Sequence, residues 1–93
     1  DNSQAHSDYL LNSGDDTTAG NITFNKADPS IIFDVTTGTD TDFWIGVQED
    51  AGSDDNDTLQ IGDGTTPGTN PFMTINTAGN VGIGTTSPTA LID

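Results

Sequence analysis

The chain has 93 residues, with 15 acidic side chains against one basic side chain and a formal net charge of −14. This balance argues against nucleic acid binding, which requires Lys and Arg to neutralise phosphates, and it disfavours anionic membranes for the same reason. The chain contains no cysteine, which excludes a disulfide framework and a thiolate metal site.

Apolar side chains are scarce but not scattered. Leu, Ile, Val and Phe supply 19 of the 93 residues, about one fifth, which is close to the composition at which chains stay disordered. They nevertheless fall in short alternating clusters. A small domain buries only ~60% of the surface that its unfolded chain exposes, so a core within one chain would be marginal. We therefore expect a core shared between chains, in an obligate homo-oligomer.

The chain order predicts short strands separated by polar turns. Residues 1–20 read as an N-terminal segment and turn, residues 21–78 as a β-strand module with an acidic loop at 49–57, and residues 79–93 as a Gly-rich closing strand with a C-terminal connection. No segment has the helical period, so the predicted fold class is all-β. Apolar and polar residues alternate in the runs between turns of Gly, Asn, Asp and Thr. This pattern predicts strands near 21–25, 31–36, 43–49, 58–62, 72–76 and 81–84.

The strongest strand signal is the run that begins at Phe43. Alternation places Phe43, Ile45 and Val47 on one face, which we predict to point inward, and it places Trp44 on the other face. Trp44 could contact a receptor or pack at an interface between chains. We favour packing, because this aromatic residue lies in the middle of a strand and not at a loop tip.

Residues 79–88 read Gly-Asn-Val-Gly-Ile-Gly-Thr-Thr-Ser-Pro. In a strand, Val81 and Ile83 would share one face, and Gly82 and Gly84 would share the other. Glycine within a strand usually marks the close approach of another backbone, as when several identical chains surround one axis. We therefore predict that these four residues lie at an oligomer interface.

This motif resembles a signature of bacteriophage tail fibres and related trimeric surface fibres, where it closes a β-rich shaft module, often ahead of an endosialidase-type intramolecular chaperone domain. Three further runs resemble phrases of the same fibres, at residues 9–24, 43–48 and 62–71. The resemblance implies a homotrimer, either as an intertwined fibre of the β-prism or triple-β-helix kind, or as small β-sandwich modules that share a core between chains.

The function that the resemblance implies is structural. The chain would be part of an extracellular fibre, on a virion tail or a cell-surface filament, that contributes to host attachment. Its expected partners are copies of itself, neighbouring fibre modules, and a host receptor or glycan, and we interpret the chain as a segment of a longer product. One alternative is a secreted or cell-surface calcium-binding adhesion module of a bacterium or archaeon. A second alternative is a fragment of a polysaccharide hydrolase.

The acidic loop is the one candidate for a metal site. Calcium takes six to eight oxygen ligands from flexible Asp, Asn and backbone groups, and the loop offers four carboxylates for this role, on Asp50, Asp54, Asp55 and Asp57. The EF-hand pattern is absent, because the closing Glu is missing. We expect an exposed loop tip with at most weak calcium binding, and no cofactor.

No catalytic residue is predicted, and the chain is expected not to be an enzyme. The one histidine, His6, lies in a polar N-terminal stretch. A glycosidase needs two carboxyl groups in a groove, one of them with a pKa raised by burial. The carboxylates of Asp40, Asp42, Glu49 and Asp50 instead fall in predicted polar turns, which provide no such groove.

Overall fold

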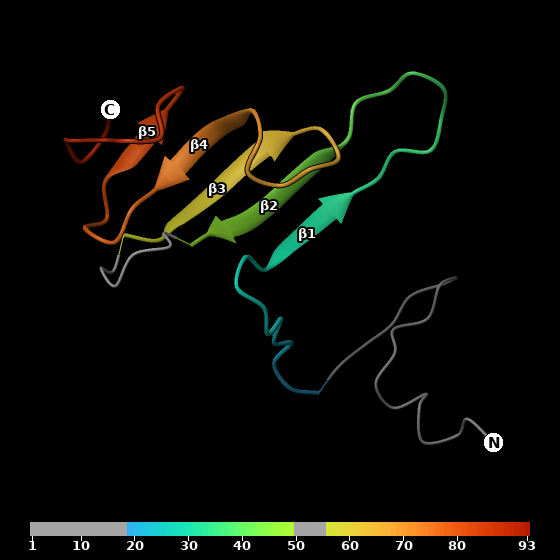
Figure 1. Ribbon diagram of the computed structural model, residues 1–93, viewed down its shortest axis with the longest axis horizontal. Coiled ribbons are helices and arrows are strands. Elements are labelled where there is room, and N and C mark those ends of the chain that lie inside the picture. The colour runs from blue at the N-terminus through green and yellow to red at the C-terminus, as the bar shows by residue number, and fades with distance from the viewer. Residues whose placement is uncertain (1–18, 50–55) are drawn as a thin grey trace.

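The computed structural model describes residues 19–49 and 56–93. Five strands in these residues form one open antiparallel sheet, in which each strand pairs with the next along the chain (Figure 1). The described residues contain no helix long and apolar enough to cross a membrane. The predicted all-β class is confirmed. The strands are β1 (Ser30–Phe33), β2 (Phe43–Gln48), β3 (Thr58–Asp63), β4 (Pro71–Ile75) and β5 (Val81–Ile83).

Most strands lie where alternation predicted them. The strand predicted at 31–36 is present as β1 but ends at Phe33. It stops because the backbone amide of Val35 donates to the Asp42 carboxylate (N···Oδ1 2.7 Å), which turns the chain toward the next strand. The strands predicted at 43–49, 58–62, 72–76 and 81–84 are confirmed as β2 to β5, to within one residue at each end.

The prediction of a strand at 21–25 is wrong. These residues are described and form no strand, and Ile22 and Phe24 are about half exposed, at 54% and 51%. The chain joins the sheet only at Pro29, whose carbonyl accepts a hydrogen bond from the Val47 amide (2.9 Å). Figure 1 shows the residues before β1 leading away from the sheet. Alternation alone did not make a strand there, because a strand also needs a neighbour for its backbone groups.

Trp44 is the one large apolar side chain that is fully buried among the described residues. Its indole Nε1 donates to the carbonyl of Asp63 (3.0 Å). The ring lies over Gly62, where a Cβ atom would come within 2.6 Å of ring atom Cζ2 and within 2.6 Å of the Asn70 carbonyl oxygen. Trp44 is a packing residue, as predicted, but it packs within its own chain and not at an interface between chains, because it is already fully buried there.

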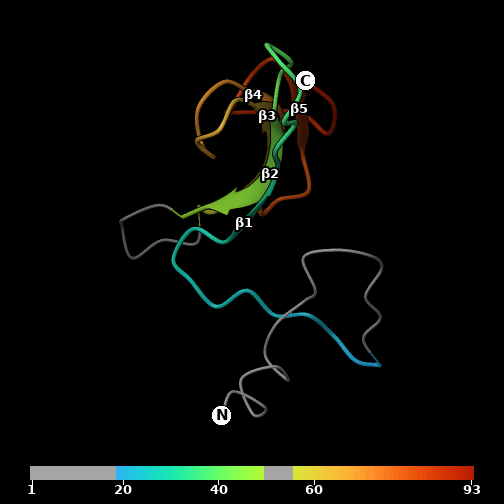
Figure 2. The ribbon, with the colours of Figure 1, turned by 90° about the vertical axis from the view of Figure 1, so that its right-hand side faces the viewer.

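The chain covers the side of the sheet that holds Trp44. The connection from β3 to β4 passes over this side, where Gly68 lies against the side chain of Gln48, and Figure 2 shows that connection standing off one side of the sheet. Phe43, on the other side, is 46% exposed. The prediction that the Phe43 side points inward is therefore wrong for the single chain, because the polar turns close over the opposite side.

The turn between β4 and β5 is held by one asparagine. The Oδ1 atom of Asn76 accepts hydrogen bonds from the amides of Ala78 (3.0 Å) and Asn80 (2.9 Å). Its Nδ2 atom donates to the carbonyl of Pro88 (3.2 Å). This side chain therefore fixes the hairpin and also ties it to the segment that follows β5.

Residues 91–93 lie along the outer edge of β5. The Val81 amide donates to the carbonyl of Leu91 (2.8 Å), and the Asp93 amide donates to the carbonyl of Val81 (2.7 Å). The pairing is parallel and places Ile92 beside Val81. The backbone of the same chain thus occupies this edge of the sheet.

A methyl group at Gly62 should destabilise the fold. In Gly62→Ala the new carbon would overlap the Trp44 ring and the Asn70 carbonyl, so we expect a loss of about 1–3 kcal/mol in the free energy of unfolding. Urea denaturation at a fixed chain concentration, followed by Trp44 fluorescence, measures this loss. Gly20→Ala is the matched control, because no atom lies within 4 Å of its Cβ position. Equal midpoints for the two variants would contradict the packing.

Candidate assembly surface

Strand register gathers eleven apolar side chains on one side of the sheet. Directly paired residues of antiparallel strands point to the same side, and side chains alternate along each strand. We call this side the open face, and it consists of Ile31, Phe33, Phe43, Ile45, Val47, Leu59, Ile61, Met73, Ile75, Val81 and Ile83. We call the other side the covered face, and it includes Ser30, Ile32, Trp44, Gly46, Gln48, Thr58, Gln60, Gly62, Thr74 and Gly82.

The open face is apolar and accessible. Asp63, opposite Phe43 at one end of the sheet, is the one charged residue within the five strands. Soluble monomers rarely leave a contiguous apolar patch larger than a few hundred Å² uncovered, so this face requires an explanation. Six of its side chains are more than one third exposed, namely Ile31 41%, Phe33 56%, Phe43 46%, Leu59 40%, Ile61 37% and Ile83 62%.

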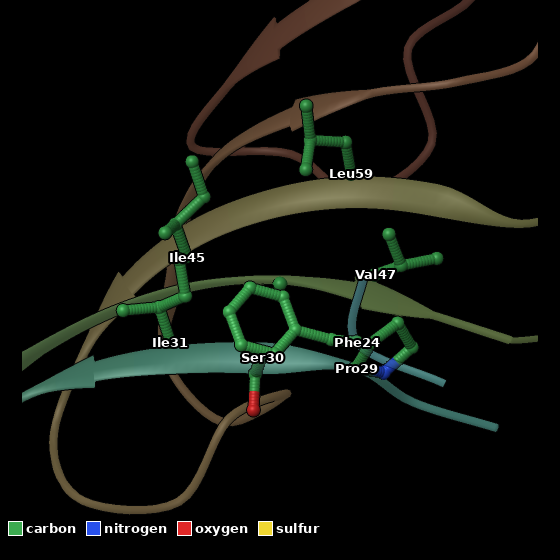
Figure 3. A pocket seen from close by; sticks show the side chains of 8 residues that line it. Phe24, Pro29, Ser30, Ile31, Ile45, Val47 and Leu59 are labelled. Atoms are coloured by element: carbon green, nitrogen blue, oxygen red, sulfur yellow. The ribbon is translucent and has the colours of Figure 1, made fainter. Parts of the chain in front are cut away.

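A shallow apolar pocket of about 230 Å³ lies on the open face, over β1 to β3 (Figure 3). One wall is Phe24, which comes from the segment that precedes β1. Ser30 is the one lining residue with a polar side-chain atom, so the pocket suits an aliphatic or aromatic side chain and offers no catalytic group. The pocket is lined by Phe24, Pro29, Ser30, Ile31, Ile45, Gly46, Val47 and Leu59.

The covered face is mostly polar, and the chain's own turns close its centre, whereas Ile32 at the β1 edge is 44% exposed. Thr74 is fully buried and Gln60 is 6% exposed, and the two residues are paired across β3 and β4. The Gln60 Nε2 atom donates to the hydroxyl of Thr58 (3.0 Å). The polar side of the sheet is therefore the side that the chain buries within itself.

The structure separates the four residues predicted at an oligomer interface. Val81 and Ile83 share one face as predicted, and that face is the open one. Gly82 lies on the covered face, where its Cβ position is 2.7 Å from the Thr85 carbonyl oxygen of the same chain. Gly84 follows β5 and has a φ of +78°, a conformation that favours glycine. The chain itself thus explains both glycines, and the interface role of all four residues stays a prediction.

The calcium candidates lie mostly outside the described residues. Asp50, Asp54 and Asp55 fall in the gap at 50–55, whereas Asp57 is described. Among residues 19–49 and 56–93, no three His, Cys, Asp or Glu side chains come together as a metal site would require. The calcium prediction therefore stays a prediction.

The carboxylates in the turns stabilise backbone and neighbouring side chains. Asp40 Oδ2 accepts from the Thr37 hydroxyl (2.6 Å), and Asp42 Oδ1 accepts from the Val35 amide. Both act as turn residues of the kind that bond their own neighbourhood. His6 lies outside the described residues.

A second, more polar pocket of about 300 Å³ lies on the side of the covered face. It includes Lys26, the one basic residue of the chain. Its lining provides a cation, a carboxylate, an amide and hydroxyl groups, but no aromatic ring on which a sugar could stack. The lining residues are Lys26, Asp28, Ser30, Ile32, Gln48, Thr66 and Pro67.

No protein-family model, curated protein or solved structure matches the chain. Any indication of function therefore comes from the geometry of the open face and from the residues of the chain itself.

Calcium should bind weakly, at most. The candidate ligands lie in one acidic loop, so we expect a dissociation constant of about 10⁻³ M, the range of loosely held extracellular sites. Isothermal calorimetry with calcium measures it, with magnesium as the control cation. A large fall in the urea midpoint on addition of a chelator would contradict this prediction and would favour the calcium-dependent adhesion module.

Proposed function

We propose that this chain is a structural module of an extracellular fibre, of the phage tail fibre kind, and that it acts by association with identical copies. The observation that carries the proposal is the open face. It joins eleven apolar side chains over five strands, and six of them are more than one third exposed.

The presence of a single layer of secondary structure supports association between copies. Stable domains pack at least two layers of secondary structure around an apolar core, whereas the described residues form a single sheet. Trp44 is the one large apolar side chain that is buried in them. A second layer from another copy would supply the core that these residues do not form by themselves, which agrees with the low apolar content of the sequence.

The charge suits a long assembly in water. Each copy carries a net charge of −14. In the described residues, every strand residue except Asp63 is uncharged, so the charge of this part lies in turns and connections. Such charge keeps assembled fibres soluble and mutually repulsive. The motif of residues 79–88 adds the resemblance to tail fibres, and with it a contribution to host attachment through a receptor or glycan.

The mass of the chain in solution tests the proposal. Sedimentation equilibrium at several chain concentrations should give a homo-oligomer, with a trimer of three times the 9.6 kDa chain mass as the expected species. Measurements at low and high salt serve as the control, because salt screens the repulsion between acidic copies and should strengthen association. A folded monomer at every concentration and salt level would contradict the fibre function.

A further inference from the structure

We propose that the open face is the contact surface between copies, and that it packs against the open faces of neighbouring copies and not against a different protein. This inference rests on the proposed fibre function and specifies which surface assembles. It shifts the predicted interface from the glycines of residues 79–88 to the apolar side of the whole sheet, of which Val81 and Ile83 are members.

Charge argues for an identical partner. The open face has no charged residue except Asp63 at its end, so a basic protein would be attracted to the acidic turns and not to this face. The partner surface must itself be apolar and nearly free of charge. The open face of a second copy has this chemistry, and two or three identical faces around a symmetry axis complement one another.

The accessible area supplies more than half of what a stable interface buries on each partner. A buried aromatic side chain hides about 150–250 Å², so the half-exposed rings of Phe33 and Phe43 present roughly 100 Å² each. With the four exposed aliphatic residues the patch is on the order of 500 Å², close to the largest patch of a typical monomer at ~300–600 Å². A stable interface buries ~800 Å² per partner, and the less exposed members of the face supply part of the difference.

The segment beyond β5 extends the open face. Ile92 is bridged in register with Val81 and is 75% exposed, so it continues the apolar surface past the last strand. The same segment occupies the edge of β5 through its backbone hydrogen bonds. A foreign strand therefore cannot pair directly with β5, which favours packing between faces as the route to association on this side of the molecule.

The pocket beside Phe24 gives the face a specific shape. Its volume of about 230 Å³ can hold one large apolar side chain from a neighbouring copy. Interfaces depend on such pockets, because a few anchored side chains carry most of the binding energy. The half-exposed Phe24 ring would then be buried by the same contact.

A charge placed at the centre of the open face tests the inference. Ile61 lies on the central strand β3, and Ile61→Asp should raise the dissociation constant of the oligomer at least about 100-fold, because a carboxylate buried without a partner is strongly unfavourable. Thr65→Asp is the matched control, since it adds the same charge at an exposed turn after β3 and should leave association within about threefold of the unmodified chain. Sedimentation measures both, and Trp44 fluorescence reports whether each variant stays folded.

A second variant decides the outcome if Ile61→Asp fails to fold. The chain has no cysteine, so Ile61→Cys introduces a single thiol on the open face, and Thr39→Cys introduces one in an exposed turn as control. Labelling of Cys at position 61 should be slowed at least about tenfold in the oligomer and restored after dissociation by dilution, whereas labelling at position 39 should not change. Equal labelling in both states, or protection that persists in the monomer because the chain's own residues cover the face, would overturn the inference.

The outcomes separate the two proposals. If the unmodified chain is an oligomer and folded Ile61→Asp remains one, the open face is not the interface, while the fibre function stands. If the unmodified chain is monomeric at all concentrations, both proposals fail.

Discussion

A single sheet has two sides, and the described turns of this chain cover the side that holds Trp44. The contact of Trp44 with Gly62, beneath the connection that reaches Asn70, selects which side that is. Gly62 and Gly82 on the covered face allow backbone to pass at close range, and Gln60 and Thr74 are buried on the same face. No layer within residues 19–49 and 56–93 packs against the apolar side chains of the other side. The packing of one side therefore leaves the other side as an apolar surface.

Strand positions were predictable from sequence because period-two alternation and turn residues are local signals. The side that is buried was not predictable, because it depends on where distant turns fold. Phe43, Ile45 and Val47 form the more apolar side of β2, which led to the prediction that this side points inward. The chain instead buries the side with Trp44. The failure at 21–25 has a related cause, since Ile22 and Phe24 alternate correctly but precede Pro29, where backbone pairing with the sheet begins.

The candidate surface was predictable in part for the same reasons. Val81 and Ile83 could be placed on one face from their spacing, and register then joined them to the other strands. Gly82 and Gly84 looked equivalent in sequence, but Gly82 accommodates the backbone of Thr85 and Gly84 supplies a positive φ just after the strand. The alternation of side chains along a strand does not show whether a glycine is required for close backbone contact or for a positive φ. The pocket was also beyond sequence reasoning, because Phe24 comes from outside the strands that form the pocket floor.

The parallel segment on β5 bears on how this protein avoids amyloid-like polymerisation. An exposed strand edge is a template on which chains can add without limit, as happens in cross-β fibrils. Here residues 91–93 already hold the outer edge of β5, so each sheet has at most the edge of β1 to offer. Two chains joined through β1 would present only this short segment at each end, and very short edges are poor templates for further strands. Edge-to-edge growth is thereby disfavoured in a chain that displays as much apolar surface as this one does.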